Sequence, residues 1–146
     1  MRHNLQLIID DVEKGPAGIP NDMCIKALKE KHKNDPNFDI EKAYNANPNI
    51  IWDEEGVMDL ATNMWISTLK TGLLNVKLYC YYADYGIIDE KNDKDMIEIH
   101  EKYASTIPYV PGTYKEIDYQ KLAKMTEKCW NSIWNWIKEH GQSLWT

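Results

Sequence analysis

The sequence has few of the residue patterns that mark common protein classes. Its three cysteines, Cys24, Cys80 and Cys129, have no CxxC spacing and so do not outline a zinc or redox site. It contains no glycine-rich phosphate loop and no Asn-x-Ser/Thr sequon. No eighteen apolar residues run together, so we expect no membrane span. The start of the chain also lacks the pattern of a signal peptide, and we predict a cytoplasmic protein with reduced thiols.

Phenylalanine is nearly absent as well, with one residue against nine tyrosines and six tryptophans. Tyr and Trp carry a polar tip as well as a ring, which suits half-buried positions and protein interfaces. The length of 146 residues and an apolar share of 43% are those of one globular domain, which we expect to cover residues 1–146.

Positive charge is scarce relative to negative charge. The formal net charge is −6, so the chain repels a phosphate backbone and nucleic acid is not expected as a partner. Four lysines between residues 26 and 33 could suggest a DNA-reading helix, but they spread around it and Glu30 interrupts them. Nothing in the sequence calls for a cofactor.

What the sequence does contain is helical patterning. Gly15-Pro16 ends a first apolar-periodic stretch, and Asn21 and Asp39 are candidate N-caps of two short helices. Asp53 is the expected N-cap of a main helix that extends to Lys70. Gly72 could then kink or break this helix. Further helices are expected from Asn92 to Tyr103 and from Asp118 to His140. The pattern predicts an all-α, single compact domain of five to seven helices.

One segment is ambiguous. Residues 73–88 are apolar on every side when drawn as a helix, which is typical of a centrally buried helix. Val76, Leu78, Cys80 and Tyr82 also alternate with other residues as they would in a strand. We favour a helix and keep a short β element around residues 74–88 as the alternative.

Four of the six tryptophans lie in the last seventeen residues. Trp136 falls on the apolar stripe of the closing helix and is expected in the core. Trp130 and Trp134 lie four residues apart on the shoulder of that stripe. They are covered either by another part of the fold or by a partner, since Trp is enriched among interface hot spots. Trp145 either folds back on the body or belongs to a dimer contact.

Acidic residues gather between residues 84 and 101, a segment with seven carboxylates and only two lysines, Lys91 and Lys94. Such a segment can be a solvated surface, or it can steer the chain toward a basic partner. The candidate partner-binding residues are Asp89, Glu90, Asp93, Asp95, Glu98, Glu101, Trp130 and Trp134.

The alternative function is a metal-dependent hydrolase. Glu55 and Asp59 are spaced to share one helix face, and Glu98 and Glu101 another, so that these four could hold Mg²⁺ or Mn²⁺ against a phosphate ester. The EIHE sequence at residues 98–101 resembles the first half of the ExxE…ExxD motif of all-α nucleotide pyrophosphohydrolases, but the second half is absent. His100 has no neighbouring metal-ligand pattern.

We therefore expect a small acidic protein that binds another protein stoichiometrically, of the inhibitor, immunity, antitoxin or phage counter-defence type, rather than an enzyme. The partner should have a basic surface. A homodimer through the C-terminal helix is the other possible contact.

Overall fold

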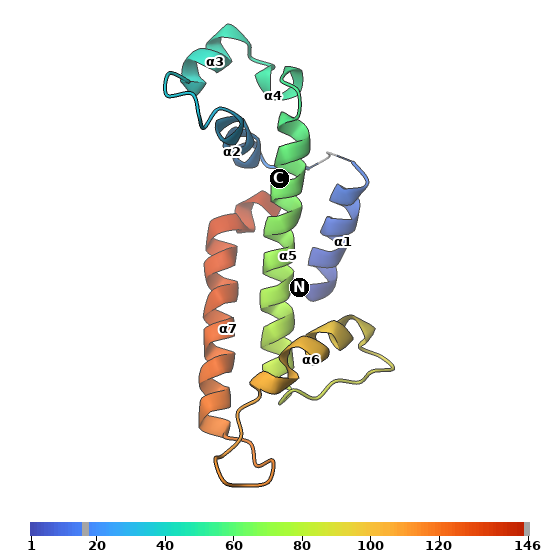
Figure 1. The fold of residues 1–146 in the computed structure, drawn as a ribbon. Coiled ribbons are helices and arrows are strands. Elements are labelled where there is room, and N and C mark those ends of the chain that lie inside the picture. Colours follow the sequence, from blue (N-terminus) through green and yellow to red (C-terminus); the bar gives the residue numbers. More distant parts are fainter. Residues whose placement is uncertain (16–17, 145–146) are drawn as a thin grey trace. The chain divides into compact units, whose positions relative to one another are not determined.

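The computed structural model describes residues 1–15 and 18–144, and within these ranges the chain is helical (Figure 1). The α-helices are α1 (Arg2–Glu13), α2 (Asn21–Lys31), α3 (Ile40–Ala46), α4 (Ile50–Asp53), α5 (Val57–Ala83), α6 (Ile97–Tyr103) and α7 (Tyr119–His140). Short 3₁₀ helices cover Lys94–Met96, Ala104–Thr106 and Gly141–Leu144. Among the described residues the only β pairing is an isolated antiparallel bridge between Tyr109 and Ile117. The all-α prediction is confirmed.

The chain packs into two compact units whose boundary falls inside α5. Of the described residues, the N-terminal unit contains 3–15 and 18–70, and the C-terminal unit contains 1–2 and 71–144. The single-domain assignment stays a prediction. In the described ranges no helix combines the length and the apolar character that crossing a bilayer requires.

The N-terminal unit is built around a small core on α2, α4 and the first half of α5. Ala27, Leu28, Val57 and Ala61 are fully buried there. Phe38, Ile40 and Tyr44 cover this core from α3 and the loop before it. Asp39 caps α3 as expected, because its carboxylate accepts hydrogen bonds from the backbone N–H groups of residues 41 and 42.

The C-terminal unit is built around the second half of α5, with α7 running beside it (Figure 1). Its buried residues include Tyr81 and Tyr82 from α5, Ile99 from α6 and Leu122 from α7. Asp118 caps α7 through the N–H of residue 121, as predicted. Trp136 is buried, which confirms its assignment to the core.

The β alternative for residues 74–88 is wrong. This stretch is α-helical to Ala83 and then turns at Tyr85 and Gly86, both with positive φ. Gly72 does not break α5, which runs uninterrupted through it. A Cβ on Gly72 would lie 2.5 Å from Cε2 of Trp136. Because Gly72 has no side chain, the backbone of α5 can lie close to the buried Trp136 indole on α7 at this position.

Three expected helix starts are wrong. Asn21 is the first helical residue of α2 rather than its cap, which is Pro20. Asp53 is the last residue of α4, and α5 begins four residues later, after a turn through Gly56, whose φ of +81° suits glycine. Asn92 does not cap α6 either, because its side chain bonds Asp89. The stretch Lys94–Met96 is a 3₁₀ turn that leads into α6.

Candidate functional site

The C-terminal unit carries a row of three aromatic rings, the exposed Trp130 and Trp134 and the partly buried Tyr79. The ring centroids of Trp130 and Trp134 lie 5.6 Å apart at an interplanar angle of 85°, the edge-to-face geometry that aromatic pairs prefer. Tyr79 on α5 extends the row, with its centroid 5.1 Å from that of Trp130. We call these three residues the aromatic ridge.

The ridge is only partly covered. Trp130 is 43% exposed and Trp134 is 46% exposed, so nearly half of the surface of each residue is open to solvent. The fold does not bury the two tryptophans as it buries Trp136. Trp145, the remaining tryptophan of this end, lies outside the described residues.

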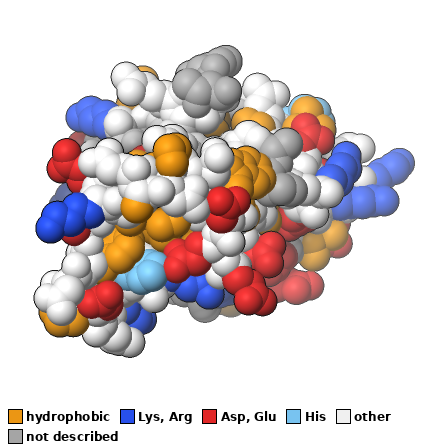
Figure 2. All heavy atoms as spheres, turned by 90° about the horizontal axis from the view of Figure 1, so that it is seen from above, with side chains coloured by type: hydrophobic (Ala, Val, Ile, Leu, Met, Phe, Trp, Pro, Cys, Tyr) orange, Lys and Arg blue, Asp and Glu red, His pale blue; other side chains and the backbone are white. Residues whose placement is uncertain are grey.

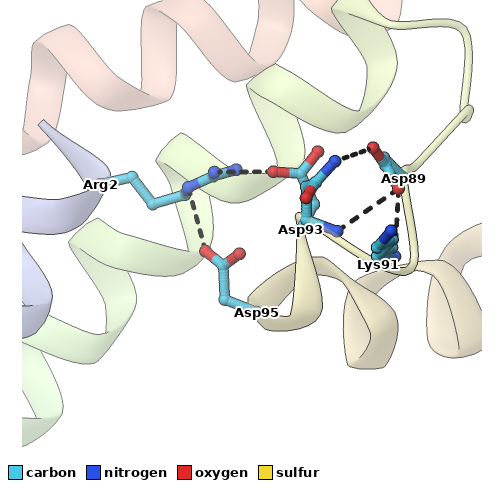
Figure 3. A network of polar contacts seen from close by, with 6 residues as sticks. Arg2, Asp89, Lys91, Asp93 and Asp95 are labelled. Carbon is cyan, nitrogen blue, oxygen red and sulfur yellow. Dashed lines mark hydrogen bonds and ion pairs between the residues drawn. The ribbon is translucent and has the colours of Figure 1, made fainter.

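The acidic segment is organised by Arg2, the only arginine in the sequence. Its Nε lies 3.0 Å from Oδ2 of Asp95, and its Nη2 lies 3.5 Å from Oδ1 of Asp93. Figure 3 shows the guanidinium pointing between the two carboxylates, so that the start of α1 is tied to the loop before α6. Asp93 and Asp95 therefore each have an internal cation, and a partner that pairs with them would compete with Arg2.

Asp89 is engaged inside the same loop (Figure 3). Its carboxylate accepts hydrogen bonds from the N–H of Lys91, at 3.1 Å, and from the side-chain amide of Asn92, at 2.5 Å. These bonds to the charged form lower the pKa of Asp89, the Asn92 bond most strongly. Of the six acidic candidates, Glu90, Glu98 and Glu101 are exposed and make neither an ion pair nor a side-chain hydrogen bond in the described part of the chain. These three carboxylates can meet a partner without losing an internal contact.

A second group of exposed aromatic residues was not singled out from the sequence. The loop between α6 and α7 is closed by the Tyr109–Ile117 bridge, with the Val110 N–H donating to the carbonyl of Glu116 at 2.7 Å. It presents Tyr109 and Tyr114 to solvent. Tyr85, in the turn after α5, and Tyr119, at the start of α7, are also exposed and meet edge to face, with centroids 5.7 Å apart. The signal in the sequence is the two prolines and the glycine of this loop, which indicate a surface loop but not which of its side chains are exposed.

The residues proposed for metal binding do not form a described cluster. Glu55 lies in the turn before α5, so it does not share a helix face with Asp59, contrary to the expectation. Glu98 and Glu101 lie on α6, in the other unit. Within residues 1–15 and 18–144, no group of three or more His, Cys, Asp or Glu side chains could hold a metal ion. The structure adds no support to the hydrolase alternative.

Two histidines pair with other side chains rather than standing alone. Nδ1 of His100 lies 3.0 Å from the hydroxyl of Tyr81, a buried residue whose pKa is raised by desolvation. Nε2 of His32 lies 2.5 Å from Oε1 of Glu54, and the imidazole stacks on Phe38 with centroids 4.0 Å apart. Each pair joins two part-buried side chains that are about twenty residues apart in the sequence, which is what a structural contact does.

The three cysteines are free thiols within the two cores. Desolvation is the main cause that raises the pKa of each one. A thiol with a raised pKa is a poor nucleophile at neutral pH, so none of the three is activated for catalysis.

Comparison with family models, with curated proteins and with solved structures finds no match for this chain. The candidate surfaces must therefore be judged on their own chemistry.

Proposed function

We propose that this chain binds another protein stoichiometrically, with the aromatic ridge as the contact surface and the acidic side chains of α6 steering the encounter. The observation that carries the proposal is the half-exposed pair of Trp130 and Trp134, locked in an edge-to-face contact beside Tyr79. Rings held in one geometry lose little conformational entropy on binding, which favours them as anchors.

The magnitude of the exposed surface supports this role. A ring of this size has about 150–250 Å² to bury, so the open parts of the two indoles amount to roughly 130–220 Å². At about 25 cal/mol per Å², covering them would contribute at most about 3–6 kcal/mol. That is the scale of an interface hot spot, and it exceeds the ~0–1 kcal/mol expected of exposed ion pairs.

The acidic side chains act at longer range. Glu98 and Glu101 lie one turn apart on α6 and are both exposed. Exposed charges of this kind raise the rate of encounter with a basic partner more than they strengthen the final complex. The partner that fits both features is a protein with a basic surface beside an apolar groove. A second copy of the chain is the other occupant to test.

The experiment begins with the oligomeric state. Sedimentation velocity of the purified chain and of the Trp130→Ala/Trp134→Ala double variant shows whether a second copy covers the ridge. The immobilised chain then captures partners from cell extract at low and moderate salt, and a candidate counts only when it saturates at one-to-one. We expect the double variant to weaken that complex at least about 30-fold, which corresponds to the loss of one hot spot of about 2 kcal/mol.

The matched control is Trp52→Ala, which removes a tryptophan that is 69% exposed in the N-terminal unit. It should change the affinity by less than about threefold. Separately, Glu98→Lys/Glu101→Lys should slow association and weaken its salt dependence with little effect on dissociation. A monomeric chain with no saturable partner, or an affinity unchanged in the double variant, would refute the proposal. An association rate unchanged at low salt would exclude α6.

A further inference from the structure

The N-terminal unit contains a pocket that the proposed protein contact does not use. It has a volume of about 450 Å³, within the range of about 300–1,000 Å³ typical of small-molecule sites. Residues from α2, α3, α4 and the first turn of α5 line it, together with the loops around them. Figure 2, which views the molecule from above, shows hydrophobic side chains reaching the surface between charged ones.

The lining divides into an apolar interior and a mouth. Ile51 and Cys24 are buried wall residues, and Met58 is partly buried. Trp52 also lines the pocket but is 69% exposed, so its ring stands at the mouth. An indole that lines a pocket of mixed polar and apolar surface offers a flat face on which a planar ligand can stack.

Two asparagines supply hydrogen-bonding groups at the same mouth. Asn21 and Asn49 both line the pocket and are exposed. Asn49 precedes α4, but its side chain makes no capping bond. Each carboxamide has an acceptor oxygen and a donor NH₂, and together they can read a ligand edge that presents both a donor and an acceptor.

The pocket carries no charge at neutral pH. Among the described residues that line it there is no Asp, Glu, Lys, Arg or His. Burial raises the pKa of the Cys24 thiol and of the Tyr44 hydroxyl, so both stay protonated. The carboxylate of Asp22 is close enough to raise the pKa of Cys24 further, and the same negative charge disfavours an anionic ligand.

We infer that this pocket binds a neutral, planar heterocycle of the nucleobase type, which stacks on Trp52 while its polar edge bonds Asn21 and Asn49. Uncharged walls exclude a ligand that must be neutralised by a counter-ion. The two carboxamides in the lining favour a heterocycle with ring nitrogens, to which they can hydrogen-bond, over a plain hydrocarbon of the same size.

The test uses adenosine as the neutral probe and adenosine monophosphate as its charged counterpart, added to the full chain. Two-dimensional NMR should show saturable shifts in the indole N–H of Trp52 and in the side-chain amides of Asn21 and Asn49. Adenosine monophosphate should bind more weakly than adenosine. Trp52→Ala should weaken adenosine binding at least about fivefold, the lower end of what a stacked base is worth.

Trp130→Ala is the matched control, because it removes an exposed tryptophan from the other unit and should leave adenosine binding unchanged. Melting temperatures of the variants verify that each is folded. The inference is overturned if adenosine gives no saturable shift up to its solubility limit. It also fails if the monophosphate binds as tightly as the nucleoside, or if Trp52→Ala binds as well as the unchanged chain. None of these outcomes bears on the aromatic ridge.

Discussion

Replacing Gly72 by alanine tests the packing of α5 against α7, because two opposing effects can be compared there. In an isolated helix, alanine is more favourable than glycine by about 1 kcal/mol. In this protein the added Cβ would lie 2.5, 2.7 and 2.9 Å from three carbons of the buried Trp136 indole. Overpacking of this kind costs about 1–3 kcal/mol. We expect a cost near about 3 kcal/mol here, because the added Cβ meets a buried ring and not the flexible end of a side chain.

The expected result is a net loss of about 1–2 kcal/mol in the free energy of unfolding, because the overlap outweighs the gain in helix propensity. At about 2–4 °C per kcal/mol for a chain of this size, the melting temperature should fall by roughly 2–8 °C. Urea unfolding followed by circular dichroism gives the free energy, and calorimetry gives the melting temperature.

Two variants make the measurement specific. Asn75→Ala lies one turn further along α5 and gains helix propensity without the overlap, so it should be neutral or stabilising. In a double-mutant cycle with Trp136→Leu, which removes the overlapping ring, a coupling of at least about 1 kcal/mol is expected. A Gly72→Ala protein as stable as the original, or more stable, would show that α5 and α7 are not packed as described.

Three further predictions follow from the contacts above. Arg2→Met should lower the stability by no more than about 1 kcal/mol per exposed ion pair lost, and the difference should fade in 1 M salt, as urea titrations at two salt concentrations would show. Because the folded pKa of Asp89 is lowered, its contribution is fully present above the ordinary aspartate value of 3.8 and is lost as the pH falls through the folded value. NMR of the Asn92 side-chain amide should follow that loss, and an amide that does not respond to acid would contradict it. The thiols of Cys24, Cys80 and Cys129 have raised pKa values, so iodoacetamide at pH 7.5 should label them far more slowly in the folded protein than in urea. Equal rates in the two states would show that burial does not protect them.

Much of the fold was readable from local patterns. Asp39 and Asp118 were recognisable as caps because their carboxylates act within three residues of the chain. Trp136 was recognisable as core because its helical stripe is strongly periodic. The strand-like alternation around Cys80 left a β element open as the alternative to the favoured helix. It did so because a helix buried on several sides shows no single polar face.

The errors arise from local turns that compete with helix caps and from contacts that are distant in sequence. Asp53 satisfies the local rule for an N-cap, but the turn at Gly56 delays α5 until Val57. Asp93 and Asp95 pair with Arg2, which is more than ninety positions away in the sequence. No local pattern near either aspartate predicts this pairing. Tyr79 likewise joins the aromatic ridge only because α7 lies beside α5.

The near-perpendicular contact of Trp130 and Trp134 also provides a native optical signal. Two indoles at 5.6 Å couple their electronic transitions, and coupled chromophores give paired circular dichroism bands of opposite sign. Any molecule that settles on these rings changes their environment and mutual orientation, and the paired bands change with them. Docking on this surface can therefore be followed in dilute solution without attaching a dye.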